Sequence, residues 1–186
     1  MSNDWHLRRA ARVLHSGGIV AHATEAVFGL ACDPQNSHAL DRLASLKSRS
    51  HGKGLILIGA NPNQVLQYAS ALTRESLEAV LASWPGPVSW VLPARVGLDS
   101  RLTGGRQSVA LRVTAHIQAA QLCECFGGAL ISTSANISGH RPATTQLKVR
   151  RSFGHGIDYI LPGRVGGRRS PSQIRDAITG RILRGA

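Results

Sequence analysis

The stretch Leu130-Ile131-Ser132-Thr133-Ser134-Ala135-Asn136-Ile137-Ser138-Gly139 places two apolar residues directly before a run dominated by serine, threonine and asparagine. This order predicts a buried strand that ends in hydroxyl and carboxamide side chains, and an open α/β sheet builds its ligand crevice at such strand ends. These side chains orient a phosphate, a carboxylate or a hydroxyl without adding charge. The same residues favour a plain turn, with Asn136 or Ser138 as a helix cap, so a turn and a binding site both stay open.

Apolar runs of strand length alternate with helical patterns on both sides of this stretch. The runs predict strands at 19–23, 55–58, 88–92, 109–113 and 159–161. Caps and helical spacing predict helices from Asp4 to Gly17, from a cap at Ser37 to Leu46, from Thr73 to Trp84, at 117–126 and at 147–153. Residues 24–30 are expected to form a loop over a strand end, and residues 173–184 a hairpin. The mixture predicts one α/β domain over residues 1–186, with a single mixed sheet and flanking helices.

The composition is that of a globular protein. Of the 186 residues, 42% are hydrophobic and 17% are charged, which excludes a disordered chain and predicts a core that needs no disulfides. No apolar run is long enough to cross a membrane and the first twelve residues lack the apolar segment of a secretory signal, so we expect a cytoplasmic protein without a membrane partner. Three cysteines without a Cys-x-x-Cys pair indicate reduced thiols.

The chain carries a formal net charge of +12. Such an excess indicates anionic partners, which could be nucleotides, nucleic acid or phosphate-rich substrates. Residues 140–186 contain ten arginines and lysines against two acids. A surface that binds polyanions and a basic surface kept for solubility both fit this excess.

A basic loop follows the second predicted helix. Lys47, Arg49 and Lys53 lie within seven residues, beside Gly52 and Gly54. Two ammonium groups and a guanidinium on one glycine-containing loop can neutralise a triphosphate, and the glycine N–H groups can add to the cradle. The alternative is a basic helix end that complements the helix dipole. The loop lacks the Walker A spacing Gly-x-x-x-x-Gly-Lys-Ser/Thr.

Residue patterns for covalent or metal catalysis are sparse. Gly-x-Ser-x-Gly is missing, no cysteine stands in a motif beside a histidine, and of the eight histidines only His51 lies inside a candidate site. The ten acids form no close pair. We therefore predict no metal site held by the protein, and any Mg²⁺ would be held mainly by the phosphates of a substrate.

Six segments, taken in order, resemble the YrdC-like family in its short, single-domain bacterial form. They are 24–30 (TEAVFGL), 47–56 (KSRSHGKGLI), 85–89 (PGPVS), 111–113 (LRV), 132–139 (STSANISG) and 171–176 (PSQIRD). The resemblance runs from about residue 19 to residue 184, and six segments in register make it specific. Ala23 and Ser50 replace prolines of the family pattern, which changes the backbone of two loops and not their charge.

The resemblance implies a twisted α/β sheet with a basic concave cavity. It also implies a nucleotidyltransferase, an L-threonylcarbamoyladenylate synthase that joins L-threonine, bicarbonate and ATP, releases pyrophosphate and supplies tRNA t6A37 modification through t6A transfer proteins. By matching positions, the implied ATP contacts are Lys47, Arg49, Lys53, Ser89, Ser134, Asn136 and Arg184, with Lys47 and Arg49 as catalytic residues. The implied threonine contacts are Thr24, Ser132 and Arg112.

The alternative hypothesis is an RNA-binding module in ribosome or rRNA maturation, because the same basic surface could contact RNA or tRNA phosphates. Aromatic residues are few and no RNA-recognition motif is present, which argues against sequence-specific readout. Glu25, an acid inside the first motif, is a candidate general base or a structural loop carboxylate.

Overall fold

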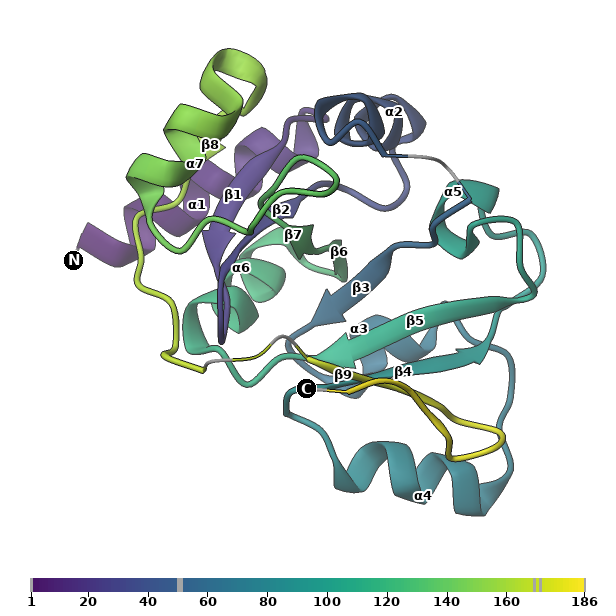
Figure 1. The fold of residues 1–186 in the computed structure, drawn as a ribbon. Coiled ribbons are helices and arrows are strands. Elements are labelled where there is room, and N and C mark those ends of the chain that lie inside the picture. The colour runs from purple at the N-terminus through teal and green to yellow at the C-terminus, as the bar shows by residue number, and fades with distance from the viewer. Residues whose placement is uncertain (1, 50–51, 169, 171, 186) are drawn as a thin grey trace.

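The chain folds into two mixed β-sheets with helices packed around them (Figure 1). The structure is a computed structural model, and it describes residues 2–49, 52–168, 170 and 172–185. Ser50 and His51 of the basic loop lie outside the described residues. The predicted α/β class is confirmed, but the strands divide between two sheets where the sequence pattern predicts one.

The smaller sheet has the strand order β7-β2-β1-β8. Its strands are β1 (Val20–Ala23), β2 (Phe28–Ala31), β7 (Thr133–Ser134) and β8 (Tyr159–Ile160). β1 and β2 form an antiparallel hairpin in which His22 pairs with Gly29. The prediction of a loop over residues 24–30 is therefore wrong in its second half. The Thr24 N–H donates to the Val27 oxygen at 3.0 Å and closes a tight turn, so the apolar residues that follow return as β2.

The larger sheet has the strand order β10-β9-β4-β5-β3-β6. Its strands are β3 (Ile56–Gly59), β4 (Val88–Pro93), β5 (Ser108–Val113), β6 (Leu130–Ile131), β9 (Gln173–Asp176) and β10 (Ile182–Arg184). β3 lies parallel to β5, while β4 lies antiparallel to β5 and parallel to β9. The predicted C-terminal hairpin is confirmed as β9 and β10, which extend this sheet beyond β4 (Figure 1).

The hydroxyl-rich stretch joins the two sheets. Leu130 and Ile131 pair with β3, and Thr133 and Ser134 pair with β2. The chain changes partner at Ser132, whose N–H donates to the Ile56 oxygen at 2.9 Å. One extended segment therefore provides an edge strand to each sheet. This explains why a strand signal in this stretch does not produce a single continuous sheet.

The five predicted helices are all present. They are α1 (Ser2–His15), α2 (Ser37–Leu46), α4 (Arg74–Ala82), α6 (Ile117–Phe126) and α7 (Gln146–Phe153). The predicted cap at Ser37 is wrong by one residue, because Asn36 Oδ1 accepts the Ala39 N–H at 3.0 Å. Three short elements have too few residues for a periodic signal: α3 (Pro62–Leu66), α5 (Ser100–Thr103) and the 3₁₀ turn η1 (Gly154–Gly156).

Two hydrophobic clusters form the interior. The larger includes Phe28, Leu57 and Leu111, and so joins the inner faces of both sheets. The smaller includes Leu14 and Leu122, where α1 packs against α6. Burying these side chains contributes roughly 1.5–3 kcal/mol for each large residue, and it fixes the positions of the strand ends.

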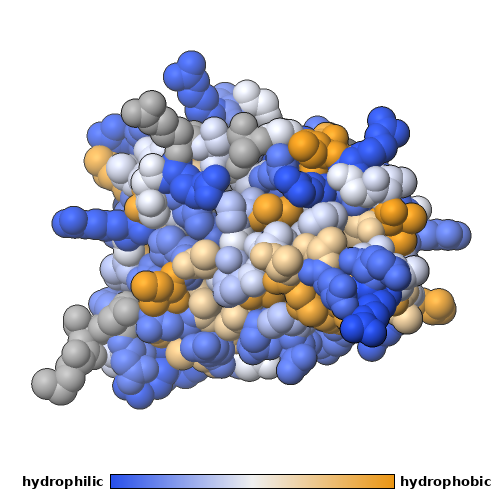
Figure 2. Space-filling model, turned by 90° about the horizontal axis from the view of Figure 1, so that it is seen from below, coloured by the Kyte–Doolittle hydropathy of each residue, from blue (hydrophilic) through white to orange (hydrophobic). Residues whose placement is uncertain are grey.

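The surface mixes both kinds of side chain. Figure 2 shows the face seen from below, where hydrophobic residues form a broken band between hydrophilic ones. The large hydrophobic side chains that are exposed include Leu81 on α4 and Ile182 and Leu183 on β10. None of the helices in the described part of the chain is both long and apolar enough to span a bilayer.

Candidate active site

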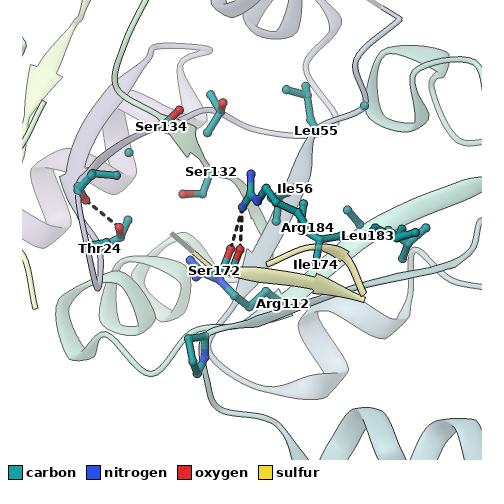
Figure 3. A pocket seen from close by; sticks show the side chains of 18 of the residues that line it. Thr24, Leu55, Ile56, Arg112, Ser132, Ser134, Ser172, Ile174, Leu183 and Arg184 are labelled. Atoms are coloured by element: carbon teal, nitrogen blue, oxygen red, sulfur yellow. Dashed lines mark hydrogen bonds between the residues drawn. The ribbon is translucent and has the colours of Figure 1, made fainter. Parts of the chain in front are cut away.

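A cavity of about 720 Å³ opens between the two sheets. Its lining includes the β1–β2 turn, the start of β3, β5, the segment around β7 and the C-terminal hairpin. Figure 3 shows Thr24, Ser132 and Ser134 on one side and Leu183 and Arg184 of the hairpin facing them. The volume falls in the range of small-molecule sites, roughly 300–1,000 Å³.

Positive charge dominates this lining. Among the described residues that border the cavity, the guanidiniums outnumber the carboxylates by five to two. They are Arg49, Arg106, Arg112, Arg168 and Arg184 against Glu25 and Asp176. Burial lowers the pKa of Arg49, Arg112 and Arg184, and these groups nevertheless remain charged at neutral pH. Partly dehydrated cations bind anions more strongly than hydrated ones, so the cavity is suited to phosphates and carboxylates.

Lys47 is buried between α2 and the hydroxyl-rich stretch. Its Nζ donates to the main-chain oxygens of Ser134 and, at 2.8 Å, of Asn136. Burial, and secondarily the neighbouring Arg49, lowers its pKa to about 8. The basic loop and the hydroxyl-rich stretch therefore converge, although Lys47 lies behind the cavity wall and not on it.

The other two cations of the basic loop separate. Arg49 borders the cavity, and its Nη2 donates to the Gly54 oxygen at 2.7 Å, so residues 49 and 54 lie close together. Lys53 is exposed and borders a different, much smaller cavity beside Leu40 and Arg101. Only one of the three predicted phosphate ligands thus faces the cavity in this conformation.

The remaining predicted ATP contacts form two local networks. Ser134 borders the cavity, and its hydroxyl donates to Asn136 Oδ1 at 2.6 Å, while Asn136 Nδ2 donates to the Ile137 and His140 oxygens. Asn136 therefore shapes its own loop. In the second network, Ser89 is buried, and its hydroxyl oxygen lies 3.2 Å from the hydroxyl oxygen of Ser172. Arg184 Nη2 donates to the Ser172 oxygen at 2.8 Å, as drawn in Figure 3.

All three predicted threonine contacts border the cavity. The Thr24 hydroxyl donates to the Val27 oxygen at 2.7 Å, and the Ser132 hydroxyl lies 3.2 Å from His22 Nε2. Arg112 Nη1 lies 3.4 Å from Glu25 Oε2, in an ion pair of which both side chains are about nine-tenths buried. Residues from the two sheets thus meet in one subsite, because the chain changes sheets at Ser132.

Glu25 compensates the charge of Arg112. Burial alone would raise the pKa of its carboxyl, but Arg112, a main-chain hydrogen bond and the Thr114 hydroxyl outweigh burial and lower it. Its Oε1 accepts the Thr114 hydroxyl at 2.8 Å. A carboxylate with a lowered pKa is a weak base, so the geometry favours the structural alternative for Glu25 over the general base.

The described residues contain no group of three His, Cys, Asp or Glu side chains that could hold a metal ion. In the cavity, Glu25 is engaged by Thr114 and Arg112, and Asp176 Oδ1 accepts the Ile178 and Thr179 N–H groups of the hairpin turn. These donors do not fit a metal site built by the protein. That Mg²⁺ arrives on ATP phosphates stays a prediction.

Sequence reasoning missed four cavity features: Arg106, Arg168, Ser172 and the His22–Ser132 contact. The first three lie in loops with no periodic pattern. His22 lies in a strand, and its polarity inside an otherwise apolar run was the available signal.

Comparisons with known proteins identify the family of the chain. The family model Sua5_yciO_yrdC, described as "Telomere recombination", matches residues 12–186. A threonylcarbamoyl-AMP synthase of Halorhodospira halophila is 51% identical over 183 residues, which is 98% of this chain and 96% of the relative. Another, of Nitrosococcus oceani, is 50% identical over 97% of this chain and 98% of the relative.

Solved structures share the fold. P. abyssi Sua5 complexed with L-threonine superposes with a TM-score of 0.87 at 32% identity, over 93% of this chain, which spans 51% of that one. E. coli YciO, with a TM-score of 0.83 at 18% identity over 96% of this chain and 87% of that one, shows the fold alone. The family model matches residues 12–186 of the chain, and relatives about 50% identical in sequence cover nearly all of it. The chain therefore belongs to the Sua5/YciO/YrdC family.

Proposed function

We propose that this protein is an L-threonylcarbamoyladenylate synthase, a nucleotidyltransferase that condenses L-threonine, bicarbonate and ATP and releases pyrophosphate. The observation that carries the proposal is the 51% identity, over 98% of the chain, to a protein named threonylcarbamoyl-AMP synthase. The arginine-rich cavity supports it, because ATP, bicarbonate and a carbamate are all anions. The product would serve t6A synthesis on tRNA.

The reaction needs positioning and charge stabilisation more than a protein nucleophile. Threonine's amine first attacks bicarbonate and becomes a carbamate with loss of water; a carbamate oxygen then attacks the α-phosphorus of ATP while pyrophosphate leaves. Like charges must be brought together in this step, and fixed cations lower that cost. In this proposal Arg49 and Arg184 bind ATP phosphates together with Ser134, while Arg112 binds the carboxylate of threonine beside Thr24 and Ser132.

Several expected contacts take supporting roles in this proposal. Lys47 and Asn136 hold the loop that presents Ser134, and Ser89 supports Ser172 behind Arg184. Lys53 would have to turn toward the cavity to reach a phosphate. Mg²⁺ carried by ATP would screen the phosphate charge. Contact with tRNA through the basic surface, and with proteins that transfer the threonylcarbamoyl group, belongs to the proposal as well.

Incubation with ATP labelled at the α-phosphate, Mg²⁺, L-threonine and bicarbonate tests the proposal. We expect a new labelled adenylate together with pyrophosphate, and both should require threonine and bicarbonate. Arg49→Ala should abolish the product, whereas Arg141→Ala, an exposed arginine outside the cavity lining, should not. No adenylate under any condition, with tight and salt-sensitive RNA binding, would favour the RNA-binding module instead.

A further inference from the structure

His22 on β1 is a buried histidine beside the cavity. Its side chain is fully buried, and its Nδ1 lies 3.0 Å from the Ala23 carbonyl oxygen. A carbonyl oxygen only accepts hydrogen bonds, so Nδ1 carries the hydrogen. Burial is the largest influence on this ring and lowers its pKa to about 4, so the ring is neutral at physiological pH. A neutral imidazole has one N–H, which leaves Nε2 as an acceptor.

This tautomer fixes the direction of the next hydrogen bond. Ser132 Oγ lies 3.2 Å from His22 Nε2, so the Ser132 hydroxyl donates to the ring. Gly29 makes the contact possible, because a Cβ at that position would lie 3.0 Å from both atoms. With its hydrogen committed to His22, Ser132 offers only lone pairs to the cavity.

The Thr24 hydroxyl is also held as a hydrogen-bond acceptor toward the cavity. Its hydroxyl donates to the Val27 oxygen at 2.7 Å, so it too offers only lone pairs. Both hydroxyls of this part of the cavity are therefore acceptors, while Arg112 provides donors and positive charge. Such a subsite matches a ligand that carries N–H or O–H donors at one end and a carboxylate at the other.

We propose that His22 is a positioning residue that holds the Ser132 hydroxyl as an acceptor, so that Ser132 and Thr24 receive the N–H and O–H groups of threonine while its carboxylate goes to Arg112. The proposal rests on the proposed function, and it assigns the orientation of the amino acid within that site. Without the His22 acceptor, the Ser132 hydroxyl is free to turn its hydrogen toward the ligand, where it would meet another hydrogen.

Steady-state kinetics of His22→Phe and His22→Gln test this assignment. Phenylalanine fills the space without an acceptor, whereas the Gln Oε1 can accept in the place of Nε2. We expect His22→Phe to raise the KM for threonine roughly tenfold, as for the loss of one hydrogen bond to a charged ligand, and to leave the KM for ATP within about twofold. His22→Gln should restore most of the loss.

The same substitution in a Ser132→Ala background shows whether His22 acts through Ser132. We expect His22→Phe to have no further effect on the KM for threonine there, because the hydroxyl that it orients is gone. Additive effects, or equal increases in the KM for threonine and for ATP, would overturn the proposal.

Nitrogen NMR of the ¹⁵N-histidine-labelled, unaltered protein is independent of activity and of the folding of any His22→Phe variant. The His22 signals, assigned by their loss in His22→Gln, should show a protonated Nδ1 and an unprotonated Nε2 at pH 7. If Nε2 is protonated in a protein that makes the adenylate, the proposed role of His22 is overturned but the proposed function is not. Absence of adenylate from the unaltered protein would overturn the proposed function and the ligand orientation with it.

Discussion

The ammonium group of Lys47 lies 2.8 Å from the main-chain oxygen of Asn136, 89 positions away in the chain. This hydrogen bond, with its neighbour to the Ser134 oxygen, ties the end of α2 to the segment that joins the two sheets. A cation that the sequence suggests as a phosphate ligand is thereby a brace of the cavity wall.

Lys47→Met should lower both stability and activity. The methionine keeps the apolar stem but leaves two main-chain oxygens without their donor, and an unsatisfied buried acceptor costs about 1–3 kcal/mol. We expect the free energy of unfolding in urea to fall by about 2 kcal/mol or more, with adenylate formation reduced. Lys148→Met, at an exposed position on α7, is the matched control. Unchanged stability in Lys47→Met would contradict the bracing role.

Arg184→Ala should weaken ATP binding while leaving the fold intact. The residue lies at the end of β10 and borders the cavity. Its Nη2 donates a hydrogen bond to the main-chain oxygen of Ser172 at 2.8 Å. Loss of one charge-assisted contact corresponds to about 1.5–3 kcal/mol, or a KM for ATP raised at least tenfold. Arg181→Ala, exposed on the same hairpin and outside the cavity lining, should keep the KM of the unaltered protein.

Glu25→Gln should destabilise the protein strongly. The change removes the counter-charge of Arg112 in a pair whose side chains are 12% and 9% exposed. Leaving one partner of a buried pair uncompensated costs about 3–5 kcal/mol. Glu78→Gln breaks an exposed pair with Arg74 and should cost less than about 1 kcal/mol. Equal costs for the two changes, measured by urea unfolding, would contradict the charge-compensating role of Glu25.

Gly29→Ala should impair the use of threonine. Its Cβ would lie 3.0 Å from His22 Nε2 and from Ser132 Oγ, and 3.3 Å from Thr24 Cγ2, so three groups of the subsite would have to shift. Overpacking of this kind costs about 1–3 kcal/mol. We expect at least a tenfold loss of kcat/KM for threonine. Gly128→Ala, where the nearest atoms are 3.9 Å away, should behave like the unaltered protein.

Stability should fall between pH 7 and pH 5 because of His22. Burial lowers its pKa from 6.5 to about 4; the Ala23 hydrogen bond and Glu25 act in the opposite sense, and His116 and Arg112 act with burial. The unfolded chain binds a proton near pH 6.5 that the folded chain does not bind until about pH 4, so acid favours unfolding in this window. At 1.36 kcal/mol per pH unit, the loss by pH 5 is about 2 kcal/mol.

Urea unfolding at pH 7 and pH 5 measures this loss, and His22→Gln is the control because glutamine does not titrate. The unaltered protein should lose about 2 kcal/mol more than the variant over this range, after the carboxylates common to both have contributed equally. Identical pH dependence in the two proteins would show that His22 titrates normally.

The sequence by itself determined most of the longer helices and strands of this protein. Helical spacing and capping residues are local, and so are apolar runs bounded by glycine and proline, which is why α1, α4, α6 and the hairpin of β9 and β10 could be predicted from their own residues. The motif resemblance likewise identified Thr24, Arg112, Ser132 and Ser134, all of which border one cavity.

Only the tertiary structure decided how these pieces are used. The change of partner strand at Ser132 depends on β2 and β3, strands far earlier in the chain, and so no local pattern contains it. The burial of Lys47, the pairing of Glu25 with Arg112 and the contact of His22 with Ser132 arise in the same way. A side chain's charge and shape are written in the sequence, whereas its hydrogen-bond partners and its access to water are fixed only when distant segments pack together.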